Sequence, residues 1–254
     1  MAGPLPIPEG LHVSEIGASR RAPTVVFVHG SLDRSTSFTR TVRRLPDMNC
    51  VVYDRRGYSR SRSLKPIAND VETHVDDLLS VIGDRQVCVV GHSLGGLIVL
   101  TAALRDPATI RSIGVYEPPL PWFEWWPNRS RGFVSEDPAD FARGFFDRVA
   151  GAGSWARLND DGRAARRADG PALVAELAAI RMPEAEIDLG AISVPTAAGR
   201  GSLSVDHHRR AAEVVAATVP GCELVEFEGA AHGAHLRHPD AFAQFTRTVV
   251  DRSS

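Results

Sequence analysis

The chain has 254 residues, of which 43% are hydrophobic and 24% charged. This composition is typical of a folded globular protein and excludes a disordered one, and the length fits a single α/β domain with an insertion. The 29 Lys and Arg residues against 31 Asp and Glu give a net charge of −2. That balance argues against nucleic acid or an anionic membrane surface as a partner.

Short apolar segments rich in β-branched residues recur along the chain, each bounded by turn residues. Such segments are typical of strands buried on both faces of a parallel sheet. We predict strands over residues 24–28, 50–53, 87–90, 110–116, 193–198 and 223–227. Helical segments are predicted over residues 70–82, 94–105, 207–218 and 239–251. The alternation predicts an α/β fold with a doubly wound, mostly parallel sheet.

The alternation is interrupted over residues 118–186, which contain no convincing strand. Helix-like patterns occur there at residues 138–149, 154–167 and 171–180. We therefore predict a helical cap over 118–186, inserted into a core formed by residues 1–117 and 187–254. The run 159–170, rich in Arg, Asp and Gly, is expected to be a solvated turn.

The three cysteines, Cys50, Cys88 and Cys222, are far apart, so we expect free thiols and neither a disulfide framework nor a zinc site. No apolar stretch approaches the 18 residues that a spanning helix needs. The first residues lack the basic and apolar regions of a secretory signal, which predicts a cytoplasmic location.

The strongest local motif is Gly91-His92-Ser93-Leu94-Gly95, which follows one predicted strand and opens a predicted helix. A nucleophile elbow needs this context, because the serine sits on a strained turn that exposes its hydroxyl, and glycines on either side avoid collision. Ser93 is therefore the candidate nucleophile, and the N–H of Leu94 is a candidate donor to an oxyanion.

Two further loops follow predicted strands. His29-Gly30 follows the predicted strand at residues 24–28. The N–H of Ser31 or Leu32, which come next in the chain, is the candidate second donor to the oxyanion. We interpret His29 as structural, or as a residue beside the substrate pocket.

His232 lies in a loop between the last strand and the last helix, where a general base can reach the serine. His235 and His238 follow it at intervals of three residues, but no acidic or cysteine ligand has suitable spacing, so no metal site is predicted. We expect these two histidines to be solvated.

Together these motifs resemble the α/β-hydrolase superfamily, in the family's order and over nearly the whole chain outside the cap. The resemblance implies Ser93 as the nucleophile and His232 as the base, with no cofactor. A serine elbow differs from the aspartate elbow of haloalkane dehalogenases and epoxide hydrolases. The matching segments are VVFVHG (25–30), VVYDRRGYSRS (51–61), VVGHSLGG (89–96), SVPT with the following glycine (193–199) and EGAAHGAHLRHPDAF (228–242).

The expected position of the third catalytic residue departs from the family pattern. Ser202 stands where the family usually carries an aspartate, and the nearest carboxylate, Asp206, lies at the mouth of a helix. Glu117 ends an earlier strand and precedes two prolines, as in family members whose acid has moved to that strand. We therefore predict Glu117 as the triad acid, with Asp206 and a salt-bridged role for Glu117 as the alternatives.

Four aromatic residues open the predicted cap: Trp122, Phe123, Trp125 and Trp126. Such a cluster either packs the cap onto the core or lines an apolar substrate pocket beside Ser93.

The sequence thus predicts a cofactor-independent serine hydrolase for a small-molecule ester, thioester or lactone with an apolar or aromatic part. Two alternatives remain open. The same triad supports perhydrolysis, C–C bond hydrolysis or lyase chemistry in related proteins, and the missing aspartate would suit a non-catalytic binding protein. The sequence does not indicate an oligomeric state.

Overall fold

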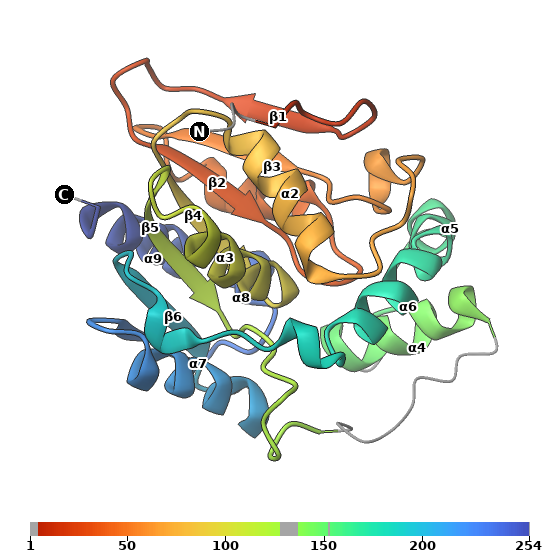
Figure 1. Ribbon diagram of the computed structural model, residues 1–254. Helices are drawn as coiled ribbons and strands as arrows, with labels where there is room; N and C mark the ends of the chain where they lie inside the picture. The colour runs from red at the N-terminus through yellow and green to blue at the C-terminus, as the bar shows by residue number, and fades with distance from the viewer. Residues whose placement is uncertain (1–4, 128–136, 152, 254) are drawn as a thin grey trace.

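A computed structural model describes residues 5–127, 137–151 and 153–253. Its described residues form a seven-stranded sheet with helices on both faces (Figure 1). The strand order is β1-β3-β2-β4-β5-β6-β7, in which β1 is antiparallel to β3 and every other pair is parallel. The predicted doubly wound α/β fold is confirmed. The strands are β1 (Val13–Ile16), β2 (Thr24–Val28), β3 (Asn49–Tyr53), β4 (Val87–His92), β5 (Ile110–Tyr116), β6 (Thr196–Gly201) and β7 (Glu223–Phe227).

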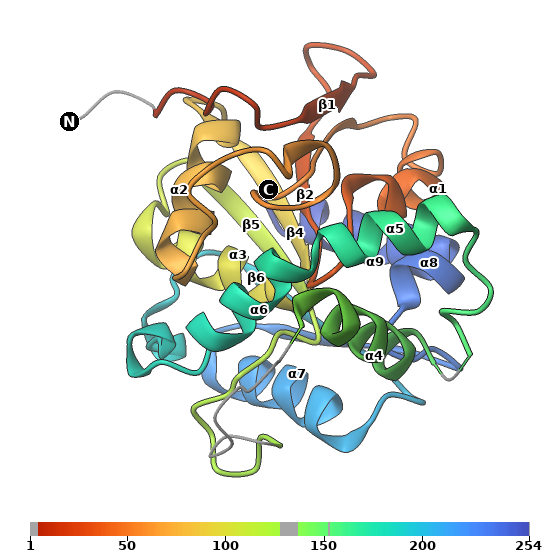
Figure 2. The same cartoon turned by 90° about the vertical axis from the view of Figure 1, so that its right-hand side faces the viewer.

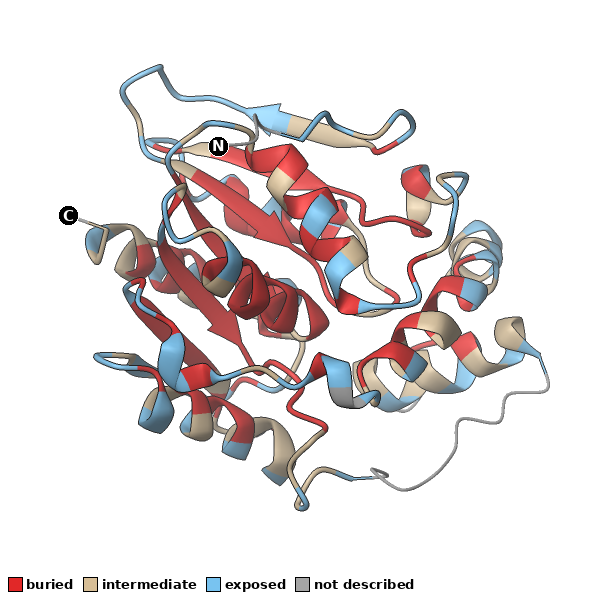
Figure 3. Cartoon of the chain, in the orientation of Figure 1, coloured by how far each residue is buried: buried red, intermediate tan, exposed pale blue. Residues whose placement is uncertain are grey.

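The helices divide into two layers and a separate group. Helices α2, α3 and α7 pack with alternate strand side chains into one apolar cluster, and α1 and α9 pack with the others into a second cluster. Figure 3 shows the resulting buried sheet between the layers. None of the described helices is long and apolar enough to cross a membrane. The helices are α1 (Thr39–Val42), α2 (Val71–Ile82), α3 (Leu94–Arg105), α4 (Pro138–Ala150), α5 (Asp160–Ala168), α6 (Gly170–Ala179), α7 (Asp206–Thr218), α8 (Ala234–Arg237) and α9 (Pro239–Asp251), with short 3₁₀ turns at Ser35–Phe38, Ser59–Ser61, Pro183–Ala185 and Leu189–Ala191.

Two strands differ from the sequence prediction. Strand β1 is missed because it is a short edge strand with two half-buried and two exposed residues, and four residues carry little periodicity. Strand β6 begins three residues later than predicted, after Pro195, whose nitrogen has no hydrogen to donate to the ladder. It then runs through Gly201, where a Cβ would collide with the backbone of Ala230.

The run 159–170 is largely helical, which confirms the helix-like pattern predicted over 154–167 for residues 160–167 and shows that the predicted solvated turn is wrong. Helix α5 occupies most of it, and the Asn159 side chain caps the helix by accepting a 2.9 Å hydrogen bond from the N–H of Gly162. Two aspartates lie in its first turn and two arginines in its last, which complements the helix dipole. The charges that suggested a turn therefore stabilise a helix.

Helices α4, α5 and α6 lie together at one side of the sheet (Figure 2). Helices α4 and α6 contact the loops after β2 and β3 through a third apolar cluster, in which Leu32 and Tyr58 pack with Ala142, Ala172 and Leu173. This arrangement places the three helices over the carboxyl end of β2. The division into a core and a cap at residues 118–186 stays a prediction.

Candidate active site

Ser93 lies on a strained turn between β4 and α3. Its backbone has φ 52° and ψ −125°, a region that costs an L-residue free energy and persists where the surroundings enforce it. The Ser93 N–H donates a 2.8 Å hydrogen bond to the Tyr116 carbonyl of β5. Glycine is required at Gly95, because a Cβ there would collide with the Val28 carbonyl. The turn thus presents the serine at the carboxyl edge of the sheet.

Glu117 follows β5 and is completely buried, also with a positive φ of 48°. Its Oε1 accepts a hydrogen bond from the Gly201 N–H at 2.8 Å, and its Oε2 accepts one from His232 Nδ1 at 2.6 Å. Both carboxylate oxygens are therefore held by N–H donors. Asp206, the alternative, is exposed at the start of α7 and pairs with Arg209.

The loop that carries His232 is held in place from two sides. The Tyr116 hydroxyl donates to the Ala231 carbonyl at 3.0 Å, and His92 Nε2 donates to the His232 carbonyl at 2.7 Å. Burial, and next the nearby His235 charge, keep the pKa of His92 well below its ordinary value, so His92 is neutral. Because His232 donates from Nδ1 to Glu117, its Nε2 is the nitrogen left to accept a proton.

The fold brings the three predicted residues to one edge. The Ser93 N–H hydrogen-bonds to the carbonyl of Tyr116, the residue before Glu117. The ring of His92, which precedes Ser93, lies 4.7 Å from the ring of His232. Among the described residues, no hydrogen bond joins Ser93 Oγ to His232 Nε2. Such bonds are often long in a site without substrate and tighten when substrate binds.

The loop at residues 30–33, which carries two of the predicted oxyanion donors and is named the oxyanion loop, contacts the elbow. A Cβ on Gly30 would come within 2.9 Å of the Ser93 Cβ, so this loop contacts the elbow directly. Leu32 in the same loop has a φ of 54°. Three of the four described non-glycine residues with positive φ are thus Leu32, Ser93 and Glu117. Concentrated backbone strain of this kind is typical of functional sites.

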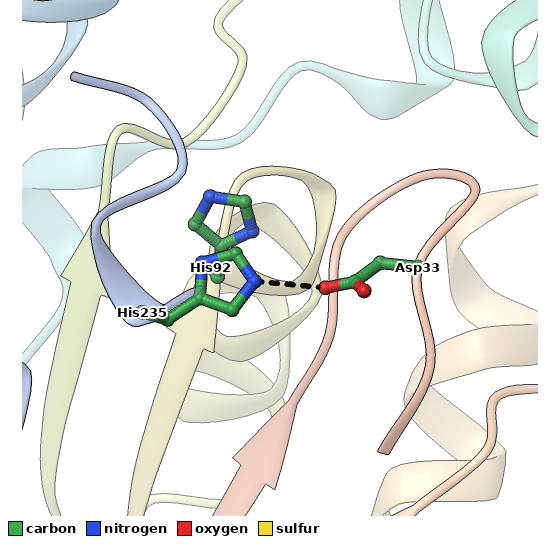
Figure 4. A group of neighbouring side chains, drawn as sticks. All are labelled: Asp33, His92 and His235. Carbon is green, nitrogen blue, oxygen red and sulfur yellow. Dashed lines mark hydrogen bonds and ion pairs between the residues drawn. The ribbon is translucent and has the colours of Figure 1, made fainter. Parts of the chain in front are cut away.

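Sequence reasoning missed a buried group beneath the elbow. His235 was expected to be solvated, but it is buried, and its Nε2 donates a 3.0 Å hydrogen bond to Asp33 Oδ2 (Figure 4). Its ring lies 4.0 Å from that of His92. Burial opposes ionisation of Asp33, but the hydrogen bond from His235 holds the pKa of that carboxyl well below its usual range. The group ties the oxyanion loop to the His232 loop.

His208 is the second residue that the sequence did not indicate. Its ring stacks on that of His232 with centroids 3.9 Å apart, and its Nδ1 lies 3.6 Å from Glu117 Oε2. Burial lowers the pKa of His208 well below its ordinary value, and the adjacent His232 lowers it further. His232 is thus the ring that hydrogen-bonds to Glu117, and His208 packs beside it with its Nδ1 buried and without a hydrogen-bond partner among the described residues.

Two groups of side chains have metal-ligand types within reach of one another: Asp33 with His92 and His235, and Glu117 with His208 and His232. In each group an imidazole N–H already donates to the carboxylate. These hydrogen bonds explain why the side chains of each group lie close together, and we assign no metal ion to either group.

The predicted pocket residues occupy different surroundings. The aromatic cluster at residues 122–126 packs against the α2–α3–α7 side of the core, and the Trp126 ring lies 4.9 Å from that of His207 on α7. His29 is completely buried, with Nδ1 donating to the Gly30 carbonyl and Nε2 accepting from the Arg55 N–H. Its nitrogens are therefore occupied within the protein.

A second aromatic group lies nearer the oxyanion loop. Phe141, Phe145 and Phe146 on α4 pack against the cluster that contains Leu32 and Tyr58. The sequence shows the helical spacing of these phenylalanines, but it does not show which part of the chain they pack against.

Comparison with known proteins places this geometry in context. A family model described as the alpha/beta hydrolase family matches residues 25–245. Polyketide synthase ThaQ of Burkholderia thailandensis is 28% identical over 273 residues, which cover 98% of this chain but only 13% of the synthase. The chain also spans only 38% and 41% of two further relatives.

Other similar proteins match over most of their length. The putative carbamate hydrolase RutD of Agrobacterium fabrum is 26% identical over 243 residues, which cover 87% of this chain and 90% of RutD. The enol-lactonase structure from Burkholderia xenovorans has a TM-score of 0.75 at 21% identity and covers 95% of each chain.

Proposed function

Because the chain belongs to the alpha/beta hydrolase family, we propose that it is a cofactor-independent serine hydrolase. Its substrate would be a small ester, thioester or lactone with an apolar or aromatic part. The observation that carries the proposal is the buried Glu117, whose Oε2 accepts a 2.6 Å hydrogen bond from His232 Nδ1 beside the strained Ser93 elbow. RutD, which is named as a hydrolase and matches 87% of this chain, supports a hydrolytic reaction.

The proposed mechanism begins at His232. Its Nδ1–H is held by Glu117, so Nε2 removes the proton from Ser93 Oγ as that oxygen attacks the substrate carbonyl. Glu117 stabilises the imidazolium that forms, because a carboxylate hydrogen bond to a charged donor is stronger than one to a neutral donor. His232 then gives the proton to the leaving group.

Backbone donors stabilise the tetrahedral intermediate in this proposal. The N–H of Leu94 lies at the N-terminus of α3, where the helix dipole favours a negative charge. The N–H of Ser31 or Leu32 supplies the second hydrogen bond to the oxyanion. Water, activated by His232, then releases the acyl group from Ser93.

The region 118–186 would shape the substrate pocket. The phenylalanines of α4 face Leu32, so an apolar acyl group at Ser93 would extend along that helix. The aromatic cluster at residues 122–126 is the alternative wall.

A fluorophosphonate probe followed by peptide mapping tests the proposal. We expect the probe to label Ser93, and Ser93→Ala to fold normally while losing on the order of 10⁴-fold or more in p-nitrophenyl ester turnover. Retention of more than about a tenth of the activity in the variant would reject Ser93 as the nucleophile. A wild-type protein that resists labelling would instead favour the non-catalytic binding protein.

A further inference from the structure

Two arginines, Arg34 and Arg166, lie where the oxyanion loop meets α5. Arg34 follows that loop, and its Nη2 lies 3.4 Å from Asp169 Oδ2. Asp169 is completely buried, and its Oδ1 already accepts hydrogen bonds from Arg62 Nε at 2.7 Å and from the Ser59 N–H at 3.2 Å. Asp169 is thus shared by two guanidinium groups.

Arg166 on α5 has no carboxylate of its own. Its guanidinium lies 4.6 Å above the Phe146 ring, and its one polar contact among the described residues is a 3.4 Å hydrogen bond to the Gly162 carbonyl. The Nε atoms of Arg34 and Arg166 are both buried without an acceptor within the described ranges. A buried N–H donor without an acceptor is costly, so each guanidinium keeps one unpaired donor, although Arg34 Nη2 and Arg166 Nη1 have acceptors.

The local charge is unbalanced. Arg34 and Arg62 pair with Asp169, and Arg166 lies three residues before it, about one helical turn, in the last turn of α5. The nearby carboxylate of Asp33 is already engaged by His235. Burial lowers the pKa of Arg166 and the nearby Arg34 charge lowers it further, whereas Asp33 and Asp169 raise it. An anion between them would remove this repulsion and could be bound by both planar groups.

Arg34 lies a few residues beyond the loop that contacts the proposed nucleophile. Gly30 contacts the elbow, and four residues of chain from Gly30 to Arg34 span at most about 14 Å. Phe146, beneath the Arg166 guanidinium, packs against the same cluster as Leu32. An anionic group held by the pair would therefore belong to a molecule that also reaches Ser93.

We propose that Arg34 and Arg166 form a subsite for an oxyanion group, carboxylate or phosphate, carried by the substrate at some distance from its scissile carbonyl. The inference rests on the proposed hydrolase function and narrows it to anionic esters or thioesters. The anion offsets the repulsion between the two arginines when substrate binds, so the subsite acts mainly on KM.

Pairs of anionic and neutral substrates show whether the anion belongs to the acyl side or to the leaving-group side of the substrate. On the acyl side, p-nitrophenyl hydrogen glutarate is compared with neutral p-nitrophenyl valerate. On the leaving-group side, butyryl-coenzyme A is compared with neutral butyryl-N-acetylcysteamine. For at least one pair, we expect the ratio of kcat/KM for the anionic over the neutral substrate to fall about tenfold or more in Arg34→Gln and Arg166→Gln.

Arg167→Gln is the matched control, because it removes the same charge from the same helix at a residue that pairs with Asp140. Its ratio should stay within about twofold of wild type. An equal fall in all three variants would indicate general electrostatic attraction and overturn the subsite, as would ratios that no variant changes.

A binding measurement on the wild-type chain requires neither a variant nor turnover. Calorimetric titration should detect glutarate or coenzyme A, and should detect neither uncharged glutaramide nor pantetheine. If Ser93 is not labelled by fluorophosphonate but an anion binds, the hydrolase function fails and the anion site stands. If neither anion binds and every anionic substrate is poorer than its neutral partner, the anion site is rejected.

Discussion

Glu117 and Asp206 are the two carboxylates that sequence reasoning considered for His232, and they occupy opposite surroundings. Glu117 is completely buried, between the Gly201 N–H and His232 Nδ1. Asp206 is exposed and faces Arg209. A carboxylate stabilises an imidazolium strongly only when it touches the ring and is shielded from water.

Glu117→Gln should therefore lower ester turnover roughly 10²–10⁴-fold, whereas Asp206→Asn should have little effect. The amide of glutamine keeps the size of the side chain but cannot stabilise the imidazolium. Steady-state kinetics on both variants, after circular dichroism has verified their folding, makes the comparison. The reverse order of losses would assign the acid to Asp206.

Sequence motifs indicated Ser93, His232 and Glu117 because each comes after a predicted strand, which can be recognised locally, and because the resemblance to the α/β-hydrolases implies catalytic roles at those positions. They could not indicate Asp33, His208 or His235. The contacts of these residues join positions that are distant in the chain, such as Asp33 with His235 and His208 with Glu117. Their partners depend on how loops converge in space, which no local pattern encodes.

At the scale of elements, strand and helix positions followed from apolar periodicity except where charge or chain geometry decided. Helix α5 carries few apolar residues and none of its side chains is buried, so its signal was end-capping and dipole complementarity. Strand β6 begins later than predicted because Pro195, which precedes it, cannot donate a backbone hydrogen bond to the sheet. Periodicity alone finds buried elements better than exposed ones.

The apolar side of α4 leads to a prediction about chain-length preference. Phe145 packs on the Leu32 cluster, whereas Trp126 packs toward His207 on α7. Phe145→Ala should change the ratio of p-nitrophenyl octanoate to acetate turnover by about 1–3 kcal/mol in free-energy terms, roughly tenfold. Trp126→Ala should change that ratio less.

Kinetics on both esters for both variants provides the measurement. If Trp126→Ala changes the ratio and Phe145→Ala does not, the acyl group extends toward α7 along the aromatic cluster at residues 122–126. Equal rates in all proteins would make both groups structural.

At the scale of the whole molecule, a completely buried ion pair joins the loop after β3 to α6. Arg55, in the loop after β3, is completely buried and donates to Glu176 on α6 at 3.0 Å and to the Gly30 carbonyl at 3.0 Å. A buried charge that loses its partner is strongly destabilising.

Glu176→Gln should therefore reduce the free energy of unfolding by about 3–5 kcal/mol. Glu72→Gln, which removes an exposed partner of Arg105, should cost at most about 1 kcal/mol. Urea midpoints and slopes for the two variants give both values. A loss below about 1 kcal/mol in Glu176→Gln would mean that α6 is held mainly by its apolar contacts.

Buried histidines make the stability of the whole molecule depend on pH. Burial, and then the adjacent Arg55 charge, lower the pKa of His29 from 6.5 to about 4. Burial also holds the pKa of His74 and His92 well below their ordinary values. In the pH range between the two values of each group, the unfolded chain binds a proton that the folded chain excludes, so lowering the pH favours unfolding.

The free energy of unfolding should thus begin to fall as the pH drops below about 6.5 and continue to fall toward pH 4, with His29 contributing up to about 1.4 kcal/mol per pH unit. Asp54 acts at lower pH. Burial opposes its charge, but hydrogen bonds from Ser35 and Arg60 lower its pKa from 3.8 to about 2. The stability that its carboxylate contributes is therefore lost as the pH falls from about 3.8 to about 2. Urea midpoints from pH 7.5 to 4.5 measure the first range. His29→Gln should flatten the slope there, since glutamine does not titrate, and a slope equal to that of wild type would show that His29 is not among the groups that control acid unfolding.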